Sequence, residues 1–135
     1  MANKIIVTDL LGNGGEPIEY TCAEATDIAK GALLELTDPR TVILNSGADK
    51  PIVGIAGHEK VGGDGSTTIS VLTNFIGKFV TKAGGSATKG DGVSGVTNDN
   101  TVNLSSTLDL EKGWQIGYAL EDAGASESLL VRVRK

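Results

Sequence analysis

Apolar and polar side chains alternate along most apolar segments of this 135-residue chain, which is the pattern of β-strands with one buried face. In the final segment, Leu129, Val131 and Val133 are predicted to face inward and the residues between them outward. Clusters of Gly, Asp, Asn and Pro separate the segments and predict tight turns. We predict strands over residues 4–7, 32–37, 41–44, 52–56, 67–73, 75–81, 93–96, 101–104, 114–120 and 128–134.

The same order of landmarks occurs twice, about sixty positions apart, which predicts one supersecondary unit used twice, over about residues 16–75 and 76–135. Because the order holds and the gaps stay small, we interpret it as a duplication rather than chance self-similarity of a chain rich in Gly, Ala and Thr. No matched position is of a catalytic type, so the repeat indicates a scaffold. The matched segments are Lys30-Gly31 and Lys89-Gly90, Leu36-Thr37 and Val96-Thr97, Thr41-Val42 and Thr101-Val102, residues 53–56 and 116–119, and residues 68–71 and 128–131.

The N-terminal segment differs from both copies. Residues 1–11 read as an extended arm, and the glycines that follow predict a hinge before a single β body over residues 16–135. The arm is more apolar than a free tail, with Ile5 and Val7 predicted to point one way and Lys4 and Ile6 the other. The hinge residues are Gly12, Gly14 and Gly15.

Few segments favour a helix. Thr21-Cys22-Ala23-Glu24 resembles a capping box for a helix that would end at Gly31. The matching segment of the second copy, residues 81–88, is too rich in Gly for a stable helix, so a single turn or a loop is the better prediction. A second helical turn is predicted from Ser106 to Lys112, and Gly54 within a strand predicts a bulge or a close backbone approach.

The composition of the chain supports an all-β fold and argues against some classes of binding partner. The chain has 39% hydrophobic residues but only 4% aromatic ones, with 19 Gly and 3 Pro, which favours short strands joined by tight loops. The formal charge of −5 and scattered basic residues argue against nucleic acid as a partner. We expect no membrane span and no signal peptide, and the lone Cys22 fits synthesis in a reducing cytoplasm.

The residues needed for catalysis or for metal binding are scarce. His58 is the only histidine and Cys22 the only cysteine, so a catalytic triad or a structural zinc site is not expected. Calcium could be considered only at residues 62–66 and at Asn98-Asp99-Asn100, but both read as turns without EF-hand spacing. We therefore expect a protein that is not an enzyme and that uses no cofactor and no metal.

Several strand motifs of the body resemble those of head decoration proteins from tailed bacteriophages, the lambda-type group. The ending differs from that group and is similar instead to other small phage capsid proteins with a Gly-Tyr-Ala strand and a final Val-Arg-Val strand. The motifs are turn and strand signatures that together cover most of the body. They are residues 30–36, Pro51-Ile52-Val53-Gly54-Ile55-Ala56, residues 66–73, Gly77-Lys78-Phe79, residues 117–120 and residues 130–133.

This resemblance implies a compact β-tulip or barrel-like body with little helix. It also implies a homotrimer on the capsid exterior of a virion, which binds the major capsid protein and stabilises the shell. An N-terminal arm would add a strand to the major capsid protein, a role for which the extended apolar arm is suited. The arm residues that would bind the capsid are Ala2, Asn3, Lys4, Ile5, Ile6, Val7 and Thr8.

Two further readings stay open. The chain could be a non-enzymatic ligand- or carbohydrate-binding β module displayed on a virion, in which Trp114, Tyr118 and the Gly-rich loops would form the site, although Trp114 is more typical of a core residue. Arg132, Arg134 and Lys135 could bind an acidic neighbour, but we favour a charged edge strand that resists aggregation.

Overall fold

The computed structural model describes residues 5–11, 16–96 and 100–135 and is built almost wholly of β-strands. The predicted strands are present, although 114–120 shortens to Gly117–Ala119 and the strand predicted over 4–7 runs over Ile6–Leu10. The structure also has a strand at Ile18–Thr21, where none is predicted from the sequence. The strands are β1 Ile6–Leu10, β2 Ile18–Thr21, β3 Leu33–Asp38, β4 Thr41–Leu44, β5 Ile52–Ala56, β6 Thr68–Leu72, β7 Asn74–Thr81, β8 Gly92–Gly95, β9 Thr101–Leu104, β10 Gly117–Ala119 and β11 Ser128–Arg134.

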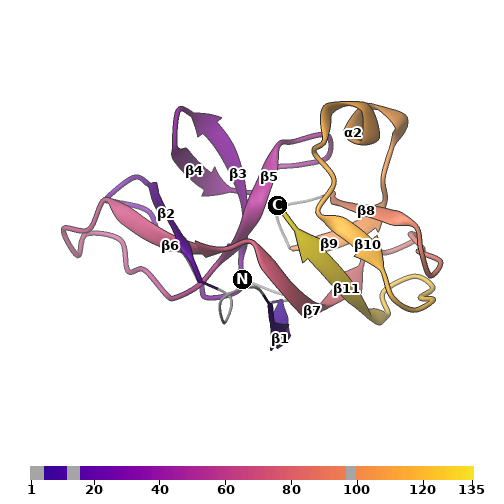
Figure 1. Ribbon diagram of the computed structural model, residues 1–135. Coiled ribbons are helices and arrows are strands. Elements are labelled where there is room, and N and C mark those ends of the chain that lie inside the picture. Colours follow the sequence, from indigo (N-terminus) through magenta and orange to yellow (C-terminus); the bar gives the residue numbers. More distant parts are fainter. Residues whose placement is uncertain (1–4, 12–15, 97–99) are drawn as a thin grey trace.

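The body consists of two five-stranded barrels of the same topology, which lie side by side (Figure 1). Barrel 1 contains β2 to β6 and barrel 2 contains β7 to β11. In each barrel the first strand pairs in parallel with the third and antiparallel with the fifth, and the other three pairings are antiparallel. The predicted duplication is therefore confirmed.

The Lys-Gly landmark of the repeat forms the same corner in both barrels. Gly31 and Gly90 adopt φ angles of 83° and 89°, which favour glycine. The Gly31 N–H donates to the Ala56 carbonyl at 2.9 Å, and the Gly90 N–H donates to the Ala119 carbonyl at 2.7 Å. The shared sequence thus encodes the same corner, between the loop before the second strand and the end of the fourth strand of each barrel.

The glycine inside the fourth strand of each barrel allows two backbones to approach closely. A Cβ at Gly54 would collide with the Leu72 carbonyl oxygen, and one at Gly117 with the Arg132 carbonyl oxygen. The register of β3 and β5 also shifts next to Gly54. The predicted close approach is confirmed, and it explains why both copies place Gly at this landmark.

One of the two segments considered for a helix is helical, and the other is a loop. Helix α2, Thr107–Lys112, begins at Ser106 with a complete capping box to Asp109 and ends at Gly113 with a φ of 69°, as predicted. Residues 22–31 form turns and one isolated bridge. The prediction of a loop here is therefore confirmed, and no helix forms. The Glu24 carboxylate accepts the Gly65 N–H of the loop between β5 and β6 instead of capping a helix.

Two apolar clusters form the core. One fills barrel 1, and the other lines barrel 2 and continues across the seam into barrel 1 through Leu33, Ile52 and Ile55. Phe75 and Phe79 stack within it with ring centroids 6.4 Å apart. Because of these contacts, the two barrels share one hydrophobic core instead of forming two independent units.

A buried asparagine closes the seam. Asn100, which is 1% exposed, accepts the Leu33 N–H of the other barrel through its Oδ1 at 2.9 Å. Its φ of 67° fits the tolerance of Asn for the left-handed region. Asn98 and Asp99, considered with it for calcium, lie outside the described residues.

We expect Gly117→Ala to lower the free energy of unfolding by more than about 2 kcal/mol, because its Cβ would push β10 away from β11. Gly54→Ala should behave alike in barrel 1. Gly47 has open space around its Cβ position, so Gly47→Ala serves as the control and should change stability by less than about 0.5 kcal/mol. Urea unfolding of the three variants measures the difference; equal stabilities would refute the close-approach argument.

Candidate docking surface around the N-terminal strand

The N-terminal arm is held by both barrels. Strand β1 pairs antiparallel with β7 of barrel 2 and forms one edge of the sheet β1-β7-β11-β10-β8-β9. Just before it, the Ile5 N–H donates to the Gly31 carbonyl of barrel 1 at 3.1 Å. Figure 1 shows β1 at the lower edge of the molecule, beside β7. The arm therefore crosses the seam between the two copies.

The alternation predicted for the arm is confirmed where it is described. Ile5 is 5% exposed and belongs to the seam cluster, Val7 is half-buried against it, and Ile6 is 60% exposed. The register shifts between Val7 and Asp9, and the Thr8 hydroxyl donates to the Ile76 carbonyl at 2.9 Å. Ala2, Asn3, Lys4, Gly12, Gly14 and Gly15, which the sequence also assigns to the arm and hinge, lie outside the described residues.

A largely apolar groove of about 370 Å³ runs between β1 and barrel 1. Its volume is at the lower end of the range for ligand pockets. The groove residues of barrel 1 are not predicted from the sequence, because they come from three separate segments of the chain. The Lys-Gly landmark of the repeat marks one of these segments. The groove is lined by Ile5, Ile6, Val7, Lys30, Gly31, Ile55, Ala56 and Leu72.

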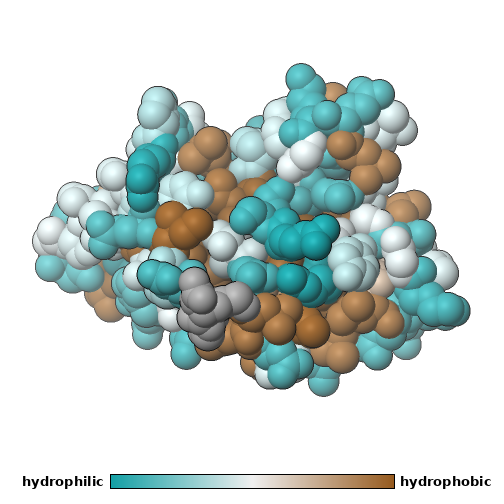
Figure 2. Space-filling model, viewed as in Figure 1, coloured by the Kyte–Doolittle hydropathy of each residue, from teal (hydrophilic) through white to brown (hydrophobic). Residues whose placement is uncertain are grey.

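The outward side of the sheet next to β1 mixes apolar and basic side chains. Lys78 pairs with Ile6 on one side and Leu130 on the other. Arg132 pairs with Ile76 and with Tyr118. Figure 2 shows hydrophobic residues gathered along the lower edge of the molecule, where Figure 1 places β1, β7 and β11.

The basic C-terminal strand β11 does not lie at the edge of a sheet, contrary to the prediction from the sequence. Because β11 lies between β7 and β10, it is not an edge strand, and the interpretation of Arg132 and Arg134 as edge protection is wrong. The Lys135 ammonium donates to the carbonyls of Gly113 and Gln115 at 2.9 and 2.6 Å. Burial lowers the pKa of Lys135 from its ordinary value.

The two aromatic residues considered for sugar binding do not share one environment. Trp114 is half-buried outside both core clusters, with the Lys112 Nζ 5.5 Å from its ring centroid, so its interpretation as a core residue is wrong. Tyr118 is 41% exposed and lies on the outward side of the sheet opposite Arg132.

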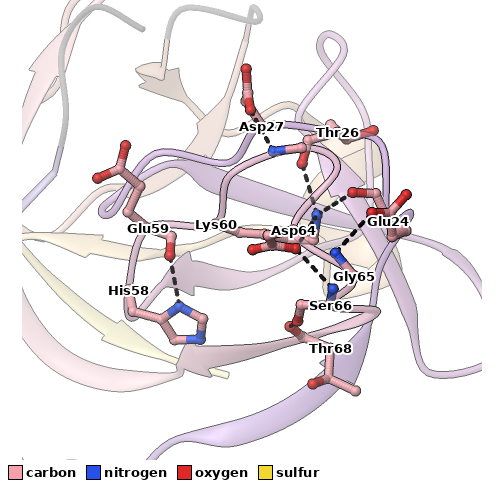
Figure 3. Close-up of polar contacts among 11 residues, drawn as sticks. Glu24, Thr26, Asp27, His58, Glu59, Lys60, Asp64, Gly65, Ser66 and Thr68 are labelled. Carbon is pink, nitrogen blue, oxygen red and sulfur yellow. Dashed lines mark hydrogen bonds and ion pairs between the residues drawn. The ribbon is translucent and has the colours of Figure 1, made fainter.

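A cluster of polar contacts lies around the loop between β5 and β6 of barrel 1 (Figure 3). The Lys60 side chain is 1% exposed, and its Nζ donates to the carbonyls of Glu24 and Thr26 at 2.7 and 3.1 Å and lies 3.8 Å from the Asp64 carboxylate. Asp27 accepts the Gly62 N–H at 2.6 Å. These groups are engaged in holding the loop.

The reactive residue types near this loop have structural roles. His58 is exposed, with its Nδ1 3.1 Å from the Glu59 carbonyl, and its Nε2 accepts the Ser70 N–H at 3.3 Å. Burial raises the pKa of the Cys22 thiol, and the Lys60 ammonium offsets part of that shift. In residues 5–11, 16–96 and 100–135, no group of three or more His, Cys, Asp or Glu is placed to share a metal ion. No helix within these ranges is long and apolar enough to cross a membrane.

Comparison with known proteins identifies related sequences and folds. A family model described as phage cement protein matches residues 12–135, which covers both barrels and begins after the arm. The fold is similar to the N base of head fiber gp8.5 of bacteriophage phi29, with a TM-score of 0.52 at 15% identity over 87% of this chain and 93% of that one. No curated protein sequence matches.

We expect Ile5→Ala to lower the free energy of unfolding by about 2–4 kcal/mol, because it empties a place in the seam cluster. Ile6→Ala, one position on, should cost less than about 0.5 kcal/mol because Ile6 is exposed. Chemical denaturation of both variants tests whether the arm is part of the folded body. Equal effects would mean that Ile5 is not anchored in solution.

We expect Lys60→Ala to cost about 1–3 kcal/mol, because two backbone carbonyls lose their donor. Loosening of the loop should also speed the reaction of the buried Cys22 with a thiol reagent at pH 8. Lys50→Ala, at an exposed position, is the control. Unchanged thiol reactivity in Lys60→Ala would show that the ammonium does not hold the loop closed.

Proposed function

Because the chain belongs to the phage cement protein family and is a structural virion protein that binds the phage capsid, we propose that it docks on the capsid exterior and stabilises the shell. It does so by buried contact area and catalyses no reaction. The observation that carries the proposal is the family match over residues 12–135, which takes in both barrels. The similarity of the fold to a phage head fiber base supports it.

The arm is the first contact that we assign to the capsid. Its Ile6 side chain is exposed, and its strand lies at a sheet edge, where an extended partner segment can add by main-chain hydrogen bonds. We assign the same role to Ala2, Asn3 and Lys4, which precede this strand, and a hinge role to Gly12, Gly14 and Gly15, which follow it. Residues 12–135 would then form the platform that presents the arm.

Trimerisation on the shell would strengthen weak arm contacts. Once one arm of a trimer has bound, the second and third bind intramolecularly, which raises the overall affinity without any new kind of contact. This arrangement suits a protein that must hold several capsid subunits together against outward pressure. Synthesis in the host cytoplasm, before docking on the assembled shell, fits the single buried thiol.

We expect the full-length protein to co-sediment with empty shells of the major capsid protein of the same phage and to raise their melting temperature in calorimetry. A variant that lacks Ala2–Lys4 keeps Ile5 in the seam cluster and should bind the shells at least about tenfold more weakly. Failure of the full-length protein to bind would refute the proposed function. Equal binding by the truncated variant would refute only the role of Ala2, Asn3 and Lys4.

A further inference from the structure

The outward side of the barrel 2 sheet presents basic and apolar side chains in adjacent rows. Strands β7, β11 and β10 lie side by side there (Figure 1). One row across them joins Lys78 to Leu130, and the next joins Ile76 through Arg132 to Tyr118. Alternate residues of a strand share a side, so these side chains point away from the buried residues between them. We call this surface the sheet face; its residues are Ile76, Lys78, Tyr118, Leu130, Arg132 and Arg134.

Barrel 1 has the opposite chemistry at the matching positions. The repeat matches Leu130 with Ser70, and their cross-strand partners are Lys78 and Glu19. Barrel 2 therefore has a basic and an apolar side chain where barrel 1 has an acidic and a polar one. Since both barrels form the same strand pairings, the fold itself does not require Lys and Leu here. The difference indicates a binding role that the sheet face has and the matching surface of barrel 1 lacks.

The positive charges of the sheet face exceed the negative ones near it. Lys78, Arg132 and Arg134 form no ion pair in the part of the chain that the structure describes. Two carboxylates, those of Asp9 and Glu121, lie at its borders. The face and its borders thus contain three basic and two acidic residues, whereas the whole chain has 12 basic and 17 acidic ones. This local excess of positive charge favours an acidic partner.

The centre of the sheet face has the composition of an interface core. Tyr and Arg are enriched in the centres of protein interfaces, where they contribute much of the binding energy. Here Tyr118 lies directly opposite Arg132. The Arg132 guanidinium donates to the Val133 carbonyl, so this side chain is held in place before a partner arrives. Less side-chain entropy is then lost on binding.

The size of the sheet face distinguishes between two possible occupants. Neighbouring strands lie about 4.8 Å apart and successive residues about 3.4 Å, which gives three strands of about six residues an area of roughly 300 Å². A stable complex of two free proteins buries about 800 Å² on each partner. A second copy that bound here alone would therefore dissociate readily. On a capsid the arm adds its own contact within the same complex, so the two weak contacts reinforce each other.

We propose that the sheet face docks on an acidic and partly apolar surface of the major capsid protein. Barrel 2 then lies against the shell, and barrel 1 points away from it. Lys78 and Arg132 lie against carboxylates of the shell, while Ile76 and Leu130 bury apolar area there. The inference rests on the proposed function and deepens it, because it adds a contact made by the side chains of a sheet face and not by the backbone of the arm.

Four variants that exchange the chemistry of the two barrels test this inference by their binding to empty shells of the major capsid protein of the same phage. Lys78→Glu and Leu130→Ser give barrel 2 the residues of barrel 1, and each should weaken binding at least about tenfold. Glu19→Lys and Ser70→Leu make the reverse exchange as matched controls and should stay within about twofold of wild type. The four positions are exposed or half-buried outside both core clusters, so the free proteins should keep nearly unchanged melting temperatures.

Salt and chemical labelling provide two further measurements. Higher ionic strength should weaken the binding of wild type more than that of Lys78→Glu, because screening removes an attraction that the variant lacks. Acetylation of the bound complex tests the orientation: Lys78 should be protected, whereas the exposed Lys50 of barrel 1 should react as in the free protein. Protection of Lys50 instead of Lys78 would overturn the proposed orientation.

Wild-type binding separates the sheet-face inference from the proposed function. If wild type binds and the four variants bind alike, or if Lys78→Glu binds more tightly, the sheet-face inference is overturned and the proposed function stands. If wild type does not bind shells, the proposed function itself fails. If Lys78→Glu converts an oligomer of the free protein into monomer, a second copy covers the face, and the sheet-face inference is also overturned.

Discussion

The apolar cluster at the seam between the barrels is the contact on which the rest of the structure depends. Each barrel has about sixty residues, a size at which a folded chain buries only roughly 60% of its unfolded surface. The cluster relieves this limit by joining Leu33 and Ile55 of barrel 1 with Phe75 and Phe79 of barrel 2. Ile5 of the arm enters the same cluster. The position of the arm therefore follows from the way in which the two copies share their core.

Because Ile5 is anchored in the core, it determines which side chains of the arm face solvent. With Ile5 and Val7 turned inward, Ile6 must face solvent and β1 must lie across the seam. The groove exists because β1 adds to barrel 2 and touches barrel 1 at Gly31. The groove thus forms at the junction between the two copies of the repeat, and neither copy forms it alone.

The copies have diverged in their loops rather than in their strands. In barrel 1 the connection from β5 to β6, residues 57–67, is held by the buried ammonium of Lys60, whereas the corresponding bridge in barrel 2 has Ala123 at that position. In barrel 2 the connection from β9 to β10 contains α2, and barrel 1 has only a loop there. Loops tolerate such changes because they lie outside the paired strands and their shared core.

Local patterns in the sequence determined the strands, their inward faces, the capped turn at Ser106, the duplication and the close approach at Gly54. Apart from the duplication, which is recognised by comparing two halves of the chain, each of these depends on residues near one another in the sequence, through the two-residue period of a strand or the geometry of a cap. Only the tertiary structure decided that β11 lies inside a sheet, that Trp114 stays outside the core, that Asn100 reaches Leu33 across the seam and that β1 borders a groove. Alternation specifies which side of a strand is buried, but the neighbours of a strand come from pairings between distant segments, and no local pattern records them.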